Sequence, residues 1–275
     1  MPLNLLLGLL IGLAAGAHTS TWGMYKDAPH EGFTWPKYFR SIILSTLIGV
    51  MIVLLAPLDL TRASNMIVLF GVIYVTERAL SEFYKTFLRE GDQSKYTIPM
   101  QLAVQGAVVQ SRSGRLLVGL CYLLGILAVI GGLSLLEKAE LPVAGVAVVL
   151  LIGSVGGWIS ALGGAWKDAP IEGFETLKFF RSPSLALAYS LLLANFTENY
   201  IFIAMGALGY TIATIETYKT FFFPSRPRGK FAGKEILFPE MLQKRQRFIP
   251  LYGAIWAALL LATAVAFVQP HHGLI

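Results

Sequence analysis

The sequence predicts an all-α integral membrane protein with about eight transmembrane helices, arranged as two parallel four-helix repeats. Hydrophobic residues make up 55% of the 275-residue chain and charged residues only 14%, whereas about a quarter of the residues in a soluble domain are charged. The apolar residues form runs long enough to cross a bilayer. A charged motif at the end of the first run recurs at the end of the fifth.

Eight apolar runs predict the individual spans. The first is predicted to be retained in the protein, because no basic residue precedes Lys26 and a signal peptide needs a charged start. Its glycine spacing, Gly12 and Gly16, recurs in the fifth run as Gly153 and Gly157. The sixth run is the shortest, because Pro183 begins it. The runs cover residues 3–22, 41–57, 66–84, 116–136, 142–163, 183–197, 201–218 and 248–268.

The repeat is visible at two places in the sequence. Residues 26–41 and 167–182 are identical at eleven of sixteen aligned positions, and residues 82–87 resemble residues 216–221. With four spans in each copy, both copies enter the membrane from the same side, so we expect a pseudo-twofold axis along the membrane normal. The predicted units are residues 1–138 and 139–275.

The basic residues predict the orientation. Of the 22 lysines and arginines, 19 lie in the four connections that follow the first, third, fifth and seventh spans. Because basic residues favour the cytoplasmic side, these connections and the repeated motifs are predicted to be cytoplasmic and both termini external. Topology also explains the net charge of +6, so no nucleic-acid partner is expected.

Two long polar connections, residues 89–115 and 224–247, combine basic residues with an apolar patch. This combination is typical of a helix that lies flat at the lipid boundary, so we expect a short surface helix in each half. Membrane lipids, including anionic headgroups, are the expected partners.

The repeated motif gathers acids and bases at the cytoplasmic rim. Pro29 and Pro170 lie within the motif and disfavour a helix interior, so the first span is predicted to end near Trp22 or Tyr25. The resulting ring would bind a phosphorylated or carboxylate ligand, or hold a divalent cation through Asp27, Glu31, Asp168 and Glu172. Alternatively, acids and bases pair to close each helical hairpin and anchor it at the interface. The motif residues are Lys26, Asp27, Glu31, Lys37 and Arg40, and Lys167, Asp168, Glu172, Lys178 and Arg181.

Charged residues inside the third and seventh spans are further candidates. Carboxylates near the hydrocarbon suggest an ion or substrate pathway, and the alternative is a Glu-Lys pair that reaches the boundary. Neighbouring helical residues point in different directions, so Glu77 and Arg78 are each expected to pair with another helix. The candidates are Glu77, Arg78, Glu82 and Lys85 in the first half, and Glu216 and Lys219 in the second.

Several chemistries lack a sequence signature. Cys121 is the one cysteine, so the chain cannot form an internal disulfide. No nucleophile elbow, Walker A, H-E-x-x-H or dinucleotide fingerprint occurs, and the four histidines form no ligand set. No cofactor is predicted, apart from Mg²⁺ if the chain is an enzyme.

Three functions fit these features, and the sequence leaves enzyme activity open. The leading hypothesis is a transporter or channel for an ion or small anionic solute, with a path between the two repeats. The first alternative is a membrane-embedded enzyme that acts on a phosphorylated lipid or headgroup with a divalent metal. The second is a non-catalytic subunit or scaffold of a larger membrane complex, or of an oligomer.

Overall fold

A computed structural model describes residues 2–93, 96, 99–140, 142–224 and 231–275, without the side chains of residues 167, 168, 171 and 172. The first half contains α1 (Pro2–Glu31), α2 (Trp35–Leu55), α3 (Ala63–Phe83), a π-helical turn (Tyr84–Leu88), strands β1 (Ala103–Val104) and β2 (Ala107–Val108), and α4 (Arg112–Lys138). The second contains α5 (Gly145–Ile152), α6 (Val155–Glu172), α7 (Thr176–Leu193), α8 (Tyr200–Phe221), α9 (Glu240–Lys244), a 3-10 turn (Arg245–Phe248) and α10 (Ile249–Val268).

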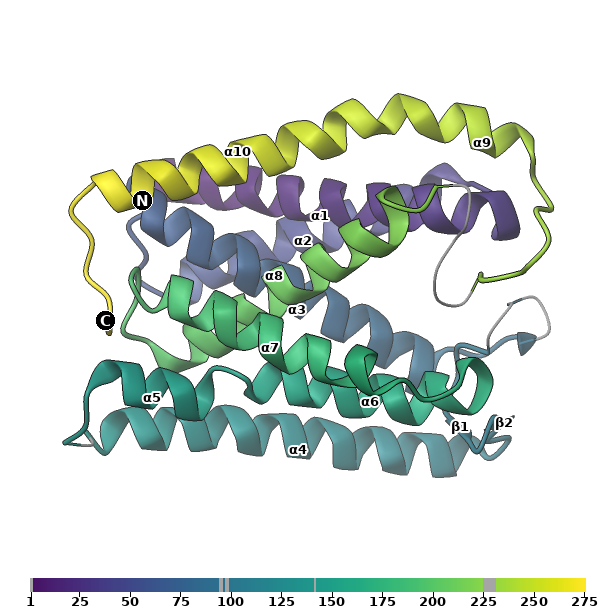
Figure 1. Cartoon of the computed structure of the whole chain (residues 1–275), viewed down its shortest axis with the longest axis horizontal. Coiled ribbons are helices and arrows are strands. Elements are labelled where there is room, and N and C mark those ends of the chain that lie inside the picture. The colour runs from purple at the N-terminus through teal and green to yellow at the C-terminus, as the bar shows by residue number, and fades with distance from the viewer. Residues whose placement is uncertain (1, 94–95, 97–98, 141, 225–230) are drawn as a thin grey trace.

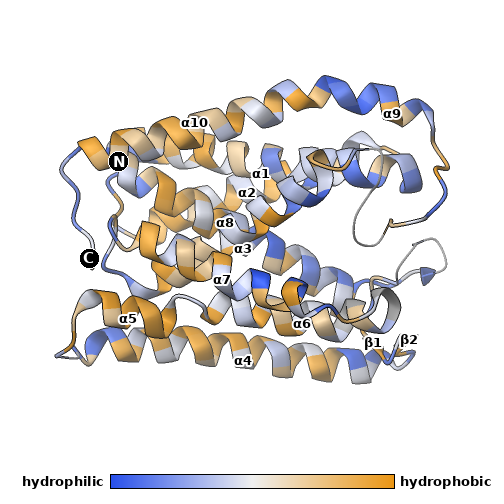
Figure 2. Ribbon diagram, viewed as in Figure 1, coloured by the Kyte–Doolittle hydropathy of each residue, from blue (hydrophilic) through white to orange (hydrophobic). Residues whose placement is uncertain are grey.

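The described chain is helical apart from one short β-hairpin, which is compatible with the predicted all-α integral membrane protein. Within the described residues, six segments are long and apolar enough to span a bilayer: Pro2–Glu31, Trp35–Leu55, Arg112–Lys138, Gly145–Trp166, Tyr200–Phe221 and Glu240–Val268. The third and sixth predicted spans also form helices, α3 and α7. Figure 2 shows hydrophobic residues along most of α4, α5 and α10. Their outward side chains suit lipid, as with Leu117 on α4, which is 63% exposed.

Helices α3 and α8 cross at the centre of the molecule (Figure 1). Glycines permit this crossing, because a β-carbon on Gly209 would lie 2.0 Å from the carbonyl oxygen of Gly71. The rings of Phe70 and Tyr210 pack beside it at 5.8 Å. Backbone contact of this kind is a common way to join helices in a membrane, where the apolar solvent supplies little driving force.

Two helical hairpins flank the crossing, α1 with α2 and α6 with α7. A β-carbon on Gly16 would lie 2.5 Å from Cα of Ile42, and one on Gly157 would lie 2.6 Å from Cα of Pro183. Helix α10 packs on α1 and α3. Helix α4 packs on the π-helical turn and α8, and its Leu133 joins a cluster with α5.

The connections after α1, α3, α6 and α8 lie at one end of the molecule, with β1, β2 and α9 (Figure 1). The chain termini and the remaining connections lie at the other end. The described basic residues of these alternate connections are therefore gathered at one end of the folded chain (Figure 1).

The prediction that α1 ends near Trp22 or Tyr25 is wrong, because α1 continues through Pro29 to Glu31. Proline lacks the N–H that would bond to the carbonyl of Tyr25. The guanidinium of Arg245 takes its place, with Nη1 donating to that carbonyl at 2.9 Å. The helix then ends at Gly32, whose φ of +76° is the left-handed conformation of a glycine cap. Helix α6 likewise contains Pro170 and ends at Gly173.

In the second half a short helix, α9, forms in the predicted connection, but it continues through the 3-10 turn into α10 and its Met241 is buried against α1 and α2. In the first half the surface-helix prediction is wrong. The described part of residues 89–111 instead contains the β1–β2 hairpin. Gln105 and Gly106 both have positive φ, 49° and 82°, as a tight two-residue hairpin turn requires. The apolar patch predicted to lie on a helix in this connection therefore lies partly on a β-hairpin.

Candidate functional site

A cavity of about 840 Å³ lies at the end of the molecule where the charged connections gather. Its walls come from α1, α2, α3 with the π-helical turn, α4, α6, α7, α8 and β1. The volume falls in the range typical of small-molecule sites. Both halves of the chain therefore contribute to one chamber.

Most of the predicted site residues meet in this cavity. Glu77 lies behind its wall with a fully buried side chain. Lys167, Asp168 and Glu172 lie outside the described side chains. The predicted residues that line the cavity are Lys26, Asp27, Glu31, Lys37, Arg40, Arg78, Glu82, Lys85, Lys178, Arg181, Glu216 and Lys219.

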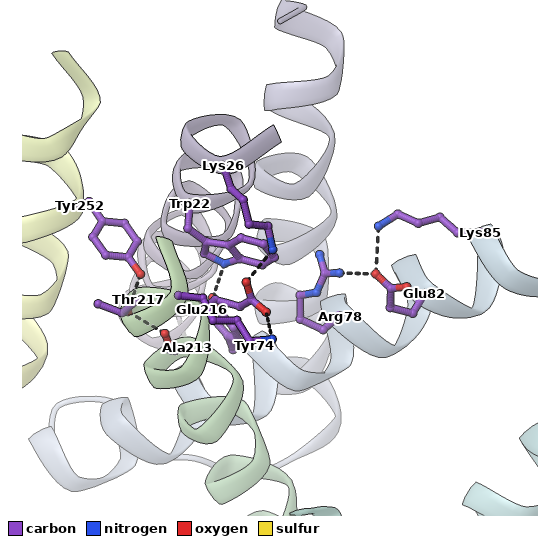
Figure 3. A network of polar contacts seen from close by, with 11 residues as sticks. Trp22, Lys26, Tyr74, Arg78, Glu82, Lys85, Ala213, Glu216, Thr217 and Tyr252 are labelled. Atoms are coloured by element: carbon purple, nitrogen blue, oxygen red, sulfur yellow. Dashed lines mark hydrogen bonds and ion pairs between the residues drawn. The ribbon is translucent and has the colours of Figure 1, made fainter. Parts of the chain in front are cut away.

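An ion pair joins α1 of the first half to α8 of the second. Nζ of Lys26 donates to Glu216 at 2.7 Å, and the two side chains are only 14% and 16% exposed (Figure 3). Lys219 approaches the other carboxylate oxygen at 3.7 Å. The ammonium of Lys26 also lies 4.6 Å from the ring centre of Trp22, a cation–π contact that offsets part of its desolvation.

A second cluster surrounds Glu82, which is paired with Arg78 and, at 3.0 Å, with Lys85 (Figure 3). The predicted i, i+3 pairs, Glu82 with Lys85 and Glu216 with Lys219, are both present. Lys85 follows α3 on the π-helical turn. Burial lowers the pKa of its ammonium to about 8, against the opposing effect of the Glu82 carboxylate.

The prediction that Glu77 and Arg78 pair only with other helices is wrong. Arg78 pairs with Glu82 one turn further along α3, and its Nη1 lies 3.9 Å from Glu77. The hydroxyl of Ser81 donates to the carboxylate of Glu77 at 2.8 Å. The Cβ atoms of Glu77 and Arg78 point in different directions, but the long side chain of Arg78 lets its guanidinium reach both Glu77 and Glu82. Glu77 is therefore held within α3, behind the cavity.

The described lining of the cavity is cationic, with nine lysines and arginines against five aspartates and glutamates. The carboxylates of Glu82 and Glu216 contact cations. Such a chamber attracts an anion, and guanidinium and ammonium groups are the common ligands of phosphate and carboxylate.

An aromatic network extends into the protein from Trp22, which lines the cavity. Nε1 of Trp22 donates to the hydroxyl of Tyr74 at 2.7 Å, and that hydroxyl lies 3.0 Å from Nδ1 of the buried His18. Tyr252 stacks on His18 with ring centres 4.2 Å apart, and its hydroxyl lies 2.6 Å from that of Thr217 (Figure 3). These residues were not predicted. The sequence feature that could have identified them is the presence of tyrosine, tryptophan and histidine side chains, which carry polar atoms, within apolar runs.

A smaller pocket of about 590 Å³ lies at the other ends of α3, α4 and α8, lined by residues that include Arg62, Glu137 and Asn199. Among the described residues, none lines both this pocket and the large cavity. The aromatic network and the α3–α8 crossing lie between the two. The fold thus has polar chambers at both ends with packed side chains between them.

Within the residues that the structure describes, no group of three or more His, Cys, Asp or Glu side chains could hold a metal ion. Asp27 and Glu31 line the cavity, whereas the side chains of the other two predicted ligands, Asp168 and Glu172, are not described. Comparisons with protein families, curated sequences and solved structures found no match to this chain. The chemistry of the site is therefore argued from its geometry.

Proposed function

We propose that the chain is a transporter or channel for a small anionic solute, with its path between two repeats. One observation carries this proposal: matching positions of the two sequence copies line the same cavity. A site shared by two parallel repeats is expected to lie on the axis between them. The matched charged pairs are Lys37 and Lys178, Arg40 and Arg181, Glu82 and Glu216, and Lys85 and Lys219.

Helix packing supports the repeat. Gly16 and Gly157 are matching positions, and each contacts the backbone of the next helix at matching positions, Ile42 and Pro183. The four basic connections lie at one end, as parallel repeats require (Figure 1). We propose residues 1–138 and 139–275 as the units, with the fourth helix of each packed against the other: α10 on α1, and α4 on α5 and α8.

The cavity and the bias of basic residues together favour a cytoplasmic mouth. At the inner end, the aromatic network and the α3–α8 crossing block a direct passage. A chamber open at one end and closed at the other is the arrangement expected of alternating access, in which one unit rocks against the other. A transporter therefore fits the geometry better than an open channel.

The test is flux into proteoliposomes of inorganic phosphate, chloride and succinate. The double variant Arg40→Gln with Arg181→Gln removes one matched pair of cations and should lower the flux of the transported anion about tenfold or more. Arg112→Gln is the control, because Arg112 pairs with Glu90, its side chain is 73% exposed, and it lines neither pocket. The absence of flux above that of empty liposomes for every probe, or unchanged flux in the double variant, would overturn the proposal.

The enzyme alternative draws on one observation. Asp27 and Glu31 line the same cavity as Lys37 and Arg40, which brings carboxylates for Mg²⁺ near cations for phosphate. The intact motif in both halves argues against it, since a single catalytic centre needs one copy. Mg²⁺-dependent turnover of a phosphorylated lipid, lost in Asp27→Asn without loss of folding, would place it above transport. Stoichiometric copurification with partner proteins, without any flux, would favour the scaffold.

A further inference from the structure

We infer that the anion is the headgroup of a lipid, which enters from the bilayer through a side opening between α4 and α6. This inference rests on the proposed anion path and names its substrate class. The headgroup would meet the cations of the cavity, while its hydrocarbon chain lies along the apolar wall that faces the membrane.

The side opening is formed by residues of two helices that do not pack closely on each other. Val118 and Tyr122 of α4, together with Gly163 and Gly164 of α6, line the cavity. Val118 and Tyr122 are 44% and 47% exposed, and a β-carbon on either glycine would meet nothing within 4 Å. In the described chain, α6 packs closely on α7, and α4 packs closely on α8. The described parts of helices α4 and α6 do not pack closely on each other.

The opposite side of the molecule is sealed, which makes the opening specific to one face. Tyr25 occupies the position that matches Trp166, yet Tyr25 is 3% exposed and Trp166 is 62% exposed. The ring of Tyr25 packs on Phe221 at 4.6 Å, and Phe221 stacks on Tyr252 of α10 at 4.2 Å. Arg245 covers the other side of Tyr25, 4.2 Å from its ring centre. The second copy has a glycine-rich wall where the first has this aromatic seal.

The wall behind the opening is apolar. Ile159, Leu208 and Ile212 line the cavity on this side, whereas the first copy has His18, Tyr74 and Arg78 at the matching positions. A soluble anion gains nothing from an apolar wall that is open to lipid. An acyl or prenyl chain keeps its hydrocarbon contacts there while its phosphate or carboxylate reaches the cations.

The test measures two probes in the same phosphatidylcholine proteoliposomes. One is transbilayer movement of a fluorescent phosphatidic acid, followed by quenching of the outer leaflet. The other is uptake of inorganic phosphate. We expect the wild-type protein to move the lipid, and Gly164→Leu to lower lipid movement about tenfold more than phosphate uptake, because the new side chain fills the opening.

Gly23→Leu is the matched control, since Gly23 lines the cavity at the matching position on the sealed side and also meets nothing within 4 Å. It should affect both probes to the same extent. Leu117→Trp adds a large side chain on the lipid face of α4, away from the cavity, and controls for the effect of added side-chain volume on that helix.

The outcomes separate this inference from the proposed function. Phosphate uptake without lipid movement in the wild type overturns the lipid route and leaves anion transport standing. Equal losses of both probes in Gly164→Leu, or no loss of lipid movement, also overturn the lipid route. No movement of either probe or of the other anions tested overturns both proposals.

Discussion

At the scale of residues, the Lys26–Glu216 ion pair joins the two halves of the chain at the wall of the cavity. The partners are 190 positions apart in the chain. Sequence spacing predicts which charges share a helix face, and it predicted the Glu82–Lys85 and Glu216–Lys219 pairs correctly. It could not predict the cross-helix partner, because that contact depends on how α1 and α8 pack.

Loss of either partner should destabilise the fold. Lys26→Met leaves the largely buried Glu216 without its closest cation, at a cost of about 3 to 5 kcal/mol. The exchange Lys26→Glu with Glu216→Lys should recover part of that loss, and Lys219→Met, at the longer distance, should cost less. Denaturant unfolding in detergent micelles measures all three. Equal stability of Lys26→Met and the wild type would show that the ion pair contributes nothing to the fold.

Lys85 should make anion binding depend on pH. The pKa of its ammonium is about 8, so the group is mostly charged at pH 7 and mostly neutral at pH 9. Arg78 and Arg40 are the neighbouring cations and Glu82 the neighbouring acid. Affinity should therefore be highest below pH 8 and fall by about tenfold at pH 9.

Sulfate is the suitable probe for this pH effect, because its own charge is constant over the range. Its dissociation constant is measured by calorimetry at pH 7, 8 and 9. Lys85→Met should bind more weakly at pH 7 and show a flat profile. A wild-type profile that is also flat would remove Lys85 from the binding site.

At the scale of elements, hydropathy predicted the helices well because an apolar run of bilayer length has few alternatives. The failures occurred at two places, for different reasons. Pro29 lies within α1, where Arg245, far along the chain, supplies the missing donor to the carbonyl of Tyr25. The β1–β2 hairpin depends on positive φ at Gln105, which residue type alone does not indicate.

The glycine contacts within the two hairpins predict matched effects of mutation. Gly16→Leu and Gly157→Leu each place a side chain against the backbone of the next helix, so each should cost about 1 to 3 kcal/mol or more by overpacking. Gly125→Ala on α4 is the control, since a β-carbon there meets nothing within 4 Å. Thermal unfolding in detergent compares the variants. A loss for only one of the two leucine variants would argue against equivalent packing in the halves.

At the scale of the whole molecule, counting spans predicted that both copies of the motif lie at the same end, and the structure has the charged connections at one end (Figure 1). The count of eight spans stays a prediction, since six segments of the described residues are long and apolar enough to span a bilayer. The side opening could not be predicted in this way. It arises from differences between matched positions, such as Tyr25 and Trp166, whose consequences depend on the surrounding packing.

The orientation predicts a labelling pattern. In a Cys121→Ser background, single cysteines at Thr34 and Glu175 should react with an impermeant maleimide only from the cytoplasmic side. A cysteine at Glu198, in the connection between α7 and α8, should react only from outside. Labelling of intact cells and inverted vesicles measures this. Reaction at positions 34 and 175 from opposite sides would contradict the parallel arrangement.

The backbone oxygen freed by Pro29 also bears on the order of assembly. Its donor belongs to Arg245, a residue that leaves the ribosome long after α1 has been inserted. On the nascent chain α1 can pack on α2 as soon as α2 has been made, but the carbonyl of Tyr25 gains its donor only after α8 has been synthesised. The last turns of α1 are therefore completed in two stages.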